Sequence, residues 1–228
     1  GAGCGGAQPP AREPIPKEKF FAATRGRAGI GQETHVVGYD SSGGAAAARL
    51  WWLLRYFGHE HTSLLNGGWQ AWQAAGLPIE TSVPQITPAI FTARPHPELI
   101  VAAADVEALR HNSAALLLDA RAAERYEGRI EPIDPRAGHI PGAISAPFAD
   151  NIAADGRMRS AEELHTRFAN LGANTTETLV CYCGSGVTAA HNLFALELAG
   201  ITGGLLYEGS WSDWSSDPTR PAATGSEP

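Results

Sequence analysis

Cys183 is the residue whose type and setting most clearly offer chemistry in this sequence. In the stretch LVCYCGSGVTAAHNLF it follows a short apolar run and precedes a loop with two glycines, after which the apolar spacing becomes helical. The first N–H groups of a helix lack partners within the helix, and the helix dipole adds positive potential there. A thiol at such a helix start is shifted toward the nucleophilic thiolate. The sequence therefore predicts that Cys183 is a nucleophile held by the main chain of the following loop.

Other chemistries of such a loop are disfavoured by the residues present. Cysteine phosphatases need an arginine six positions after the cysteine, and that position is Ala189. A phosphate-binding P-loop needs a lysine, which CGSGVT lacks. A metal site of Cys181, Cys183 and His191 is conceivable, but Cys-x-Cys alone is a weak signal, so we expect neither a metal nor a cofactor. We expect Cys181 to be a structural thiol on the opposite side of the strand from Cys183.

Charge and cysteine content limit the classes of partner. The 228 residues carry a net charge of −7 and no run of Lys or Arg, which argues against nucleic acid and anionic membranes and leaves small molecules and proteins. Cysteines at positions 4, 181 and 183 are too few for a disulfide framework, so the reducing cytoplasm is the expected compartment. We expect no export signal and no membrane span, because no apolar run reaches the roughly 18 residues required.

Residues 35–72 and 178–214 are two copies of one unit. Each has a short β-branched run, a Gly/Ser loop, a segment of helical spacing, a glycine, a second apolar run and a Gly-x-Trp-x-x-Trp ending. Trp69 lies 142 positions before Trp211. Two such strand, loop, helix, strand units imply two domains with parallel sheets. The spacing predicts one apolar face per helix, made of Leu50, Leu53, Leu54 and Phe57 in the first and Val187, Ala190, Phe194 and Leu198 in the second.

The second copy is preceded by elements that the first copy lacks. We expect a helix over residues 103–112, a strand over 114–121 and another strand after the turn GHIPG. Because the first copy has no counterpart of LLLDAR or GHIPG, we expect its domain to be N-terminally truncated, as part of a longer protein or as an unstable lobe with exposed apolar surface. The expected division is a partial, inactive domain (1–82), a proline-rich linker (83–97), a catalytic domain (98–216) and a mobile tail (217–228).

The loop CGSGVTA, the motif GHIPGA, the tandem repeat and the ending GSWSDW together resemble the two-domain rhodanese family of sulfurtransferases, over residues from about 20 to 220. Within that family, the loop is most similar to those of 3-mercaptopyruvate sulfurtransferases. The resemblance implies an α/β fold of tandem rhodanese-like domains, each a parallel sheet flanked by helices, with Asp40 at the inactive equivalent of Cys183. It implies a persulfide on Cys183, held by the main chain of Gly184, Ser185, Gly186, Val187 and Thr188.

The charge of the loop separates two sulfur donors. Gly184 and Ser185 are neutral where members of the family that use thiosulfate carry basic residues, so 3-mercaptopyruvate is the expected donor and thiosulfate the alternative. The resemblance also implies two arginines upstream of GHIPG for the donor carboxylate. Arg125 matches the first of them, and Arg136, or else Arg129, matches the second. The expected acceptor is a thiol, cyanide or a thioredoxin-like protein.

The sequence differs from the resembling enzymes at one place that leaves a different class of function possible. The resembling enzymes place acidic and histidine side chains of the first domain near the loop serine, and here REPIP has Glu13 in place of the histidine. A module that carries persulfide or senses redox state, without efficient turnover, therefore remains an alternative.

Several further residues are expected to have structural roles. His139 of GHIPG is expected to be a turn residue, and Asp119 is expected to cap the next helix or to pair with Arg121 or Arg125. Packing roles are expected for the repeated tryptophans Trp69, Trp72, Trp211 and Trp214.

Overall fold

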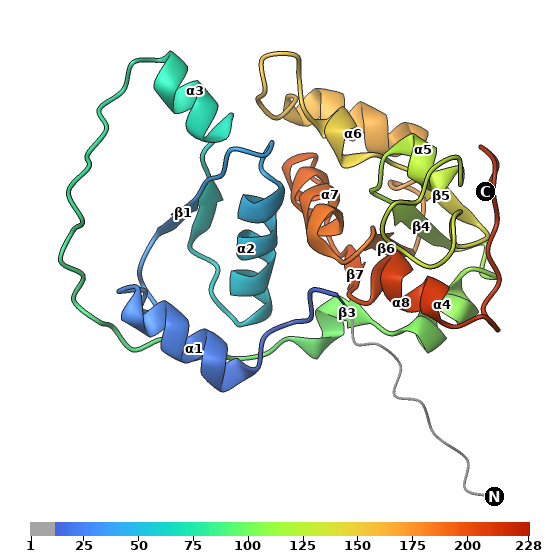
Figure 1. Ribbon diagram of the computed structural model, residues 1–228, viewed down its shortest axis with the longest axis horizontal. Coiled ribbons are helices and arrows are strands. Elements are labelled where there is room, and N and C mark those ends of the chain that lie inside the picture. The colour runs from blue at the N-terminus through green and yellow to red at the C-terminus, as the bar shows by residue number, and fades with distance from the viewer. Residues whose placement is uncertain (1–11) are drawn as a thin grey trace, which may run out of the picture.

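Two parallel β-sheets, one in each repeat, organise the computed structural model, which describes residues 12–228 (Figure 1). In the first repeat, β1 (Val36–Gly38) pairs with β2 (Thr62–Leu64). The second sheet has the strand order β3-β7-β6-β4-β5, with every pair parallel. Its strands are β3 (Ile100–Val101), β4 (Ala115–Asp119), β5 (Ala143–Ser145), β6 (Thr178–Tyr182) and β7 (Leu205–Tyr207). The two parallel sheets expected from the duplication are confirmed.

The duplicated unit has the same order of elements in both copies. Helix α2 connects β1 to β2 and α3 follows, just as α7 connects β6 to β7 and α8 follows. The Gly-x-Trp-x-x-Trp endings, for which the sequence predicted no secondary structure, therefore form short helices. The bounds are α2 (Ala45–Tyr56), α3 (Gly68–Ala74), α7 (Val187–Leu198) and α8 (Ser210–Ser216).

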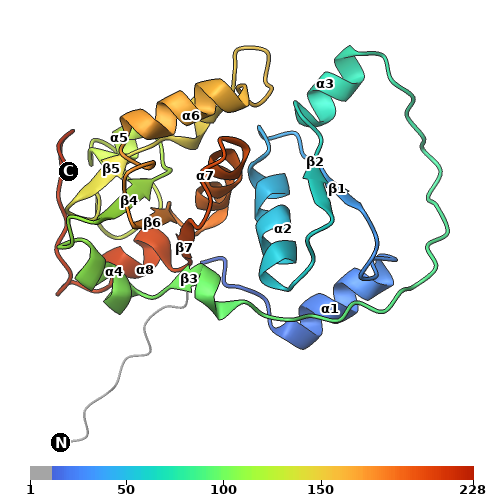
Figure 2. The ribbon, with the colours of Figure 1, turned by 180° about the vertical axis from the view of Figure 1, so that it is seen from behind.

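Helices α2 and α7 lie side by side between the two sheets, as both views show (Figures 1 and 2). Because each helix has strands on one side and the other helix on the opposite side, each is buried around much of its circumference. Ala48, Trp52 and Leu54 are all buried in α2. The prediction of one apolar face per helix is thus too narrow, and Leu198, placed on such a face, is 41% exposed.

The tryptophans have unequal roles in the two copies. Trp211 and Trp214 of α8 are completely buried and belong to a core cluster with Val180 of β6. Their equivalents in α3, Trp69 and Trp72, are only partly buried. The predicted packing role is therefore confirmed for α8 and holds only partly for α3.

The remaining helices surround this central arrangement. The helix expected over 103–112 and the strand expected over 114–121 are confirmed with shorter bounds, as α4 and β4. Helices α1 and α6 were not predicted; α6 begins with a capping box in which Ser160 and Glu163 bond each other's main-chain N–H groups. Within residues 12–228, no helix is long and apolar enough to cross a membrane. The bounds are α1 (Glu18–Arg27), η1 (Pro97–Leu99), α4 (Ala103–Leu109), α5 (Ala123–Tyr126), η2 (Phe148–Asn151) and α6 (Ala161–Asn170).

The first sheet is narrow and partly uncovered. Within the described part of the chain it consists of β1 and β2, and Val37 and Tyr39 are 52% and 58% exposed. Residues 75–96 form a long arc without regular structure (Figure 1), in which Val83 is almost fully exposed. The arc is attached at its far end, because Phe91 is buried against the first repeat.

The segment 217–228, expected to be a mobile tail, is joined to the turn GHIPG by main-chain hydrogen bonds. The main chains of His139 and Ala223 exchange two hydrogen bonds, of 2.9 and 3.0 Å, and the N–H of Gly225 donates to the carbonyl of Glu127 at 2.9 Å. The turn GHIPG thus presents unpaired main-chain groups that the tail satisfies. This pairing joins segments about eighty residues apart, which composition does not reveal.

Candidate active site

The loop after β6 provides a main-chain donor to the sulfur of Cys183. Cys183 follows the last residue of β6, and α7 begins four residues later at Val187. The N–H of Gly186 donates to Cys183 Sγ at 3.1 Å. Within residues 12–228, no acceptor pairs with the main-chain N–H groups of Gly184, Ser185, Val187 and Thr188. The predicted loop residues therefore supply one donor to the sulfur and four main-chain N–H groups without an acceptor in this part of the chain.

The ending of the second repeat fixes this loop in place. The N–H of Cys183 donates to Ser210 Oγ at 3.1 Å, and the N–H groups of Trp211 and Ser212 donate to the carbonyls of Cys183 and Gly184 at 2.9 and 3.0 Å. Ser210 has a φ of 53°, a conformation that costs free energy for a residue other than glycine. The hydroxyl of Ser210 also donates to the carbonyl of Tyr207 at 2.9 Å, which helps to hold it there.

Gly186 is required by both conformation and space. Its φ is 87°, and a methyl group at this position would lie 3.1 Å from the carbonyl oxygen of Glu208 and 3.5 Å from Arg49 Nη1. The glycine therefore lets the loop turn into α7 while its neighbours approach closely.

Two guanidinium groups lie beside Gly184. A methyl group there would be 3.1 Å from Arg12 Nη2 and 3.4 Å from Arg125 Nη1. Arg125 Nη2 is also paired with Glu131 at 2.7 Å and with Asp134 at 2.9 Å, and both carboxylates are almost completely buried. The structure thus brings the predicted Arg125 to the loop and adds Arg12, which the sequence did not single out.

The other two arginines named for the donor carboxylate lie elsewhere. Arg136 donates to main-chain carbonyls around the end of α8, among them those of Ser215 and Asp217, both at 2.9 Å. Arg129 is paired with Glu127 on the surface and is 60% exposed. Arg136 and Arg129 are therefore not included in the donor site.

Asp119 and His139 have the structural partners that the sequence suggested. Asp119 accepts hydrogen bonds from the buried side chain of Arg121, one of them at 2.6 Å, and Arg121 also reaches Glu131 at 3.3 Å. Since Glu131 is a partner of Arg125, this buried network holds Arg125 in position. His139 is completely buried, and its Nδ1 bonds the carbonyl of Tyr126 at 2.8 Å.

Cys181 does not point away from Cys183 as expected. Both residues belong to the same core cluster, because side chains two positions apart along a strand lie on the same face. Cys181 is fully buried, and burial raises the pKa of its thiol, which fits the structural role predicted for it. Cys4 lies outside the described residues.

The conceivable metal site is not formed. In the part of the chain that the structure describes, no group of three His, Cys, Asp or Glu side chains is arranged to hold a metal ion. His191 instead bonds Asn151 through Nδ1 at 3.2 Å and the carbonyl of Gly43 through Nε2 at 3.1 Å.

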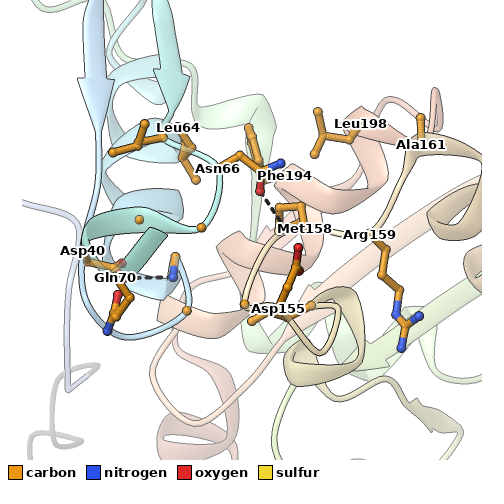
Figure 3. A pocket seen from close by; sticks show the side chains of 17 residues that line it. Asp40, Leu64, Asn66, Gln70, Asp155, Met158, Arg159, Ala161, Phe194 and Leu198 are labelled. Carbon is orange, nitrogen blue, oxygen red and sulfur yellow. Dashed lines mark hydrogen bonds between the residues drawn. The ribbon is translucent and has the colours of Figure 1, made fainter. Parts of the chain in front are cut away.

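In the first repeat, a carboxylate occupies the place of the thiol. Asp40 accepts hydrogen bonds from the N–H groups of Ser42, Gly44 and Ala47 at 2.8, 2.9 and 2.9 Å. Burial alone would raise the pKa of Asp40, but these bonds outweigh it and lower the pKa. A cavity of about 520 Å³ beside this loop is lined by Asp40, Met158 and other side chains, and by none of residues 183–188 (Figure 3). The cavity therefore lies beside the Asp40 loop and not beside the loop of Cys183.

Sequence reasoning missed two cations of the site. Arg12 precedes Glu13 in REPIP, and Glu13 Oε2 is 3.5 Å from Ser185 Oγ, so this segment lies against the loop. Arg49 of α2 reaches the carbonyl of Gly186 at 3.4 Å from the other repeat. A charged residue within the apolar stretch AAAARLWWLL was the available signal for Arg49.

Comparison with known proteins agrees with this geometry. The rhodanese-like domain family matches residues 7–75 and 102–217. The chain is 48% identical over 216 residues to a probable 3-mercaptopyruvate sulfurtransferase of Pseudomonas aeruginosa, covering 94% of this chain and 76% of that protein. It is 38% identical over 206 residues to the human 3-mercaptopyruvate sulfurtransferase, with coverages of 88% and 69%. A putative thiosulfate sulfurtransferase of Mycobacterium tuberculosis, SseB, is 38% identical over 217 residues, with coverages of 94% and 75%.

Solved structures share the fold. SseA from Escherichia coli, described with the rhodanese fold and the catalytic mechanism of its class, matches with a TM-score of 0.76 and 34% identity, over 88% of this chain and 76% of that one. An anaerobic ergothioneine biosynthesis enzyme from Chlorobium limicola matches with a TM-score of 0.81 and 26% identity, and this chain spans 56% of its length. On the family match and these relatives, the chain belongs to the rhodanese-like family and is a sulfurtransferase.

Proposed function

We propose that this protein takes sulfur from 3-mercaptopyruvate, holds it as a persulfide on Cys183 and passes it to a thiophilic acceptor. The observation that carries the proposal is the loop itself, where the N–H of Gly186 contacts the sulfur and four further N–H groups have no acceptor among residues 12–228 and could hold the added sulfur. The curated relatives named as 3-mercaptopyruvate sulfurtransferases support this choice of donor.

The transfer balances without any redox partner. The Cys183 thiolate attacks the donor sulfur, a sulfur–sulfur bond forms, and the carbon–sulfur bond breaks with its electron pair on carbon. The donor's thiol proton then passes to that carbon, so that pyruvate leaves and an anionic persulfide remains. A thiol, cyanide or a thioredoxin-like protein would next attack the outer sulfur and restore the thiolate. The reducing cytoplasm, which keeps such a thiol available, is the proposed compartment.

Arg125 and Arg12 are the proposed partners of the donor carboxylate. Both guanidinium groups lie within a few ångströms of Gly184, and Arg125 is held by buried acidic residues. Guanidinium groups match carboxylates in charge and shape. Ser185 adds a neutral hydroxyl, which suits a singly charged donor better than a dianion.

Thiosulfate is the second candidate donor, because two cations at one loop would also suit a dianion and because a relative named as a putative thiosulfate sulfurtransferase is 38% identical. Release of pyruvate and of sulfite, measured side by side, distinguishes the two donors. Replacing both Gly184 and Ser185 with basic residues should shift preference toward thiosulfate. An unchanged ratio of the two rates would contradict the charge argument.

Peptide mass spectrometry after incubation with each donor tests the proposal directly. We expect a gain of one sulfur atom on the peptide that contains Cys183, its loss in Cys183→Ser and its retention in Cys181→Ser. Equal loss in both variants would show that the nucleophile is wrongly assigned. A persulfide that forms only when a second protein supplies it would favour the carrier or sensor alternative instead.

A further inference from the structure

In each repeat, one side chain of the central helix, α2 or α7, contacts the loop of the other repeat. Arg49 Nη1 of α2 donates to the carbonyl of Gly186 at 3.4 Å, and His191 Nε2 of α7 bonds the carbonyl of Gly43 at 3.1 Å. Arg49 and His191 lie 142 positions apart, which is the offset that superposes Trp69 on Trp211. The two contacts are therefore equivalent and cross the same interface in opposite directions.

The contact between Arg55 and Glu197 obeys the same symmetry. These two residues also lie 142 positions apart and face each other across the interface, with their charged atoms 2.5 Å apart. Both side chains are 40% exposed, so the pair lies near the surface and away from either loop. It provides an interfacial cation on the same helix as Arg49 for comparison.

The two loops differ in the charge of the residue that contacts each of them from the other repeat. The charge of Asp40 is stabilised by hydrogen bonds from three main-chain N–H groups of its own loop, and its neighbour from the other repeat, His191, is neutral near pH 7. Below the loop that carries the thiol, the corresponding residue is Arg49, a permanent cation. The cation Arg49 thus contacts the loop whose sulfur, on Cys183, is proposed to carry negative charge.

Arg49 is a buried cation whose hydrogen-bond partners within residues 12–228 are uncharged. It is 8% exposed, its guanidinium donates to the carbonyls of Gly186 and Glu13, and it lies over the face of Trp52 at 5.2 Å. Burial lowers the pKa of Arg49, and negative charge on Cys183, followed by Glu208 and Glu13, acts in the opposite direction. Since a buried cation is costly unless it is paired, an anionic sulfur on Cys183 is favoured beside it.

We propose that Arg49 is a positioning residue for sulfur transfer, supplied by the first repeat, whose buried guanidinium holds the Gly186 carbonyl and favours the thiolate and persulfide of Cys183. The first repeat, although it carries Asp40 in its own loop, would thereby complete the site of the second. This inference rests on the proposed persulfide chemistry.

The test measures how alkylation of Cys183 by iodoacetamide depends on pH, by peptide mass spectrometry on the full chain. Arg49→Gln keeps a hydrogen-bond donor and removes the charge, whereas Arg49→Lys keeps the charge. We expect the midpoint of the pH profile to rise by about one pH unit in Arg49→Gln, which makes alkylation about tenfold slower below the midpoint. Arg49→Lys should restore most of that loss, and Arg55→Met should leave the midpoint unchanged.

A merely structural role for Arg49 would lower thermal stability in both Arg49 variants without moving the midpoint, and that result would overturn the proposal. An equal rise of the alkylation midpoint in Arg55→Met would also overturn the proposal. It would show that the midpoint responds to any disturbance of the interface and not to Arg49 itself. Should Arg49→Gln fail to fold, Arg49→Met is measured in its place against Arg49→Lys. Failure of the proposed function is seen separately, as absence of a persulfide in the unmodified protein.

Discussion

Lowering the pH from about 7 to about 4 should destabilise this protein through His191, a buried residue of α7 that bonds the Gly43 carbonyl of the Asp40 loop. Burial is the main cause that lowers the pKa of His191 from 6.5 to about 4; the Gly43 carbonyl and Asp40 oppose this effect, and Arg167 adds to it. The Nδ1 atom already accepts a hydrogen bond from the amide of Asn151, so a second proton there would face another donor.

The magnitude follows from the difference between the folded and unfolded chains. The unfolded chain binds this proton near pH 6.5 and the folded chain only near pH 4, so the unfolded chain holds more protons between these values. The free energy of unfolding is therefore unaffected by this group above about pH 6.5 and decreases as the pH falls below it. The gap of about 2.5 pH units corresponds to a loss of about 2 kcal/mol near pH 5 and about 3 kcal/mol at pH 4.

Urea denaturation followed by tryptophan fluorescence, in steps from about pH 7 to about pH 5, measures this loss. His191→Gln removes the titrating group, so it should lower stability at neutral pH but lose about 2 kcal/mol less than the unmodified protein on acidification. His59, whose pKa is also lowered by burial, is present in both proteins and cancels in the comparison. Parallel losses in the two proteins would refute the assignment to His191.

Three further changes test the supports of the site. Gly138→Ala should cost more than about 1 kcal/mol and expose the tail to protease, because φ is 110° and the new methyl would lie 2.1 Å from the Ala223 carbonyl oxygen; an unchanged melt would contradict this. Ser210→Ala should cost about 1–3 kcal/mol and slow persulfide formation by leaving the Cys183 N–H unpaired, with unaltered kinetics as the opposing result. Cys181→Ala should retain persulfide formation, measured by mass, since burial keeps that thiol protonated.

Local features of the chain were enough to predict the chemistry and the architecture. The strand, the glycine loop and the start of α7 are continuous in sequence, so the place of Cys183 before a helix can be recognised from residues within a few positions of it. The duplication is likewise visible as a repeated pattern at a constant offset, which predicted parallel sheets in both halves. The placement of Cys181 opposite Cys183 was wrong because side chains two positions apart on a strand lie on the same face. That period could have been applied to the sequence alone.

The tertiary structure alone decided which charges serve the loop. Arg125 and Arg136 both precede GHIPG, yet Arg125 lies beside Gly184 whereas Arg136 binds carbonyls around the end of α8. Arg49 reaches the loop from the other repeat and Arg12 from the segment before the first repeat, at separations where no sequence pattern links the partners. A nucleophile at the start of its own helix can be recognised from neighbouring residues. The cations beside it come from distant segments of the chain, which only the packing of the whole chain brings to the loop.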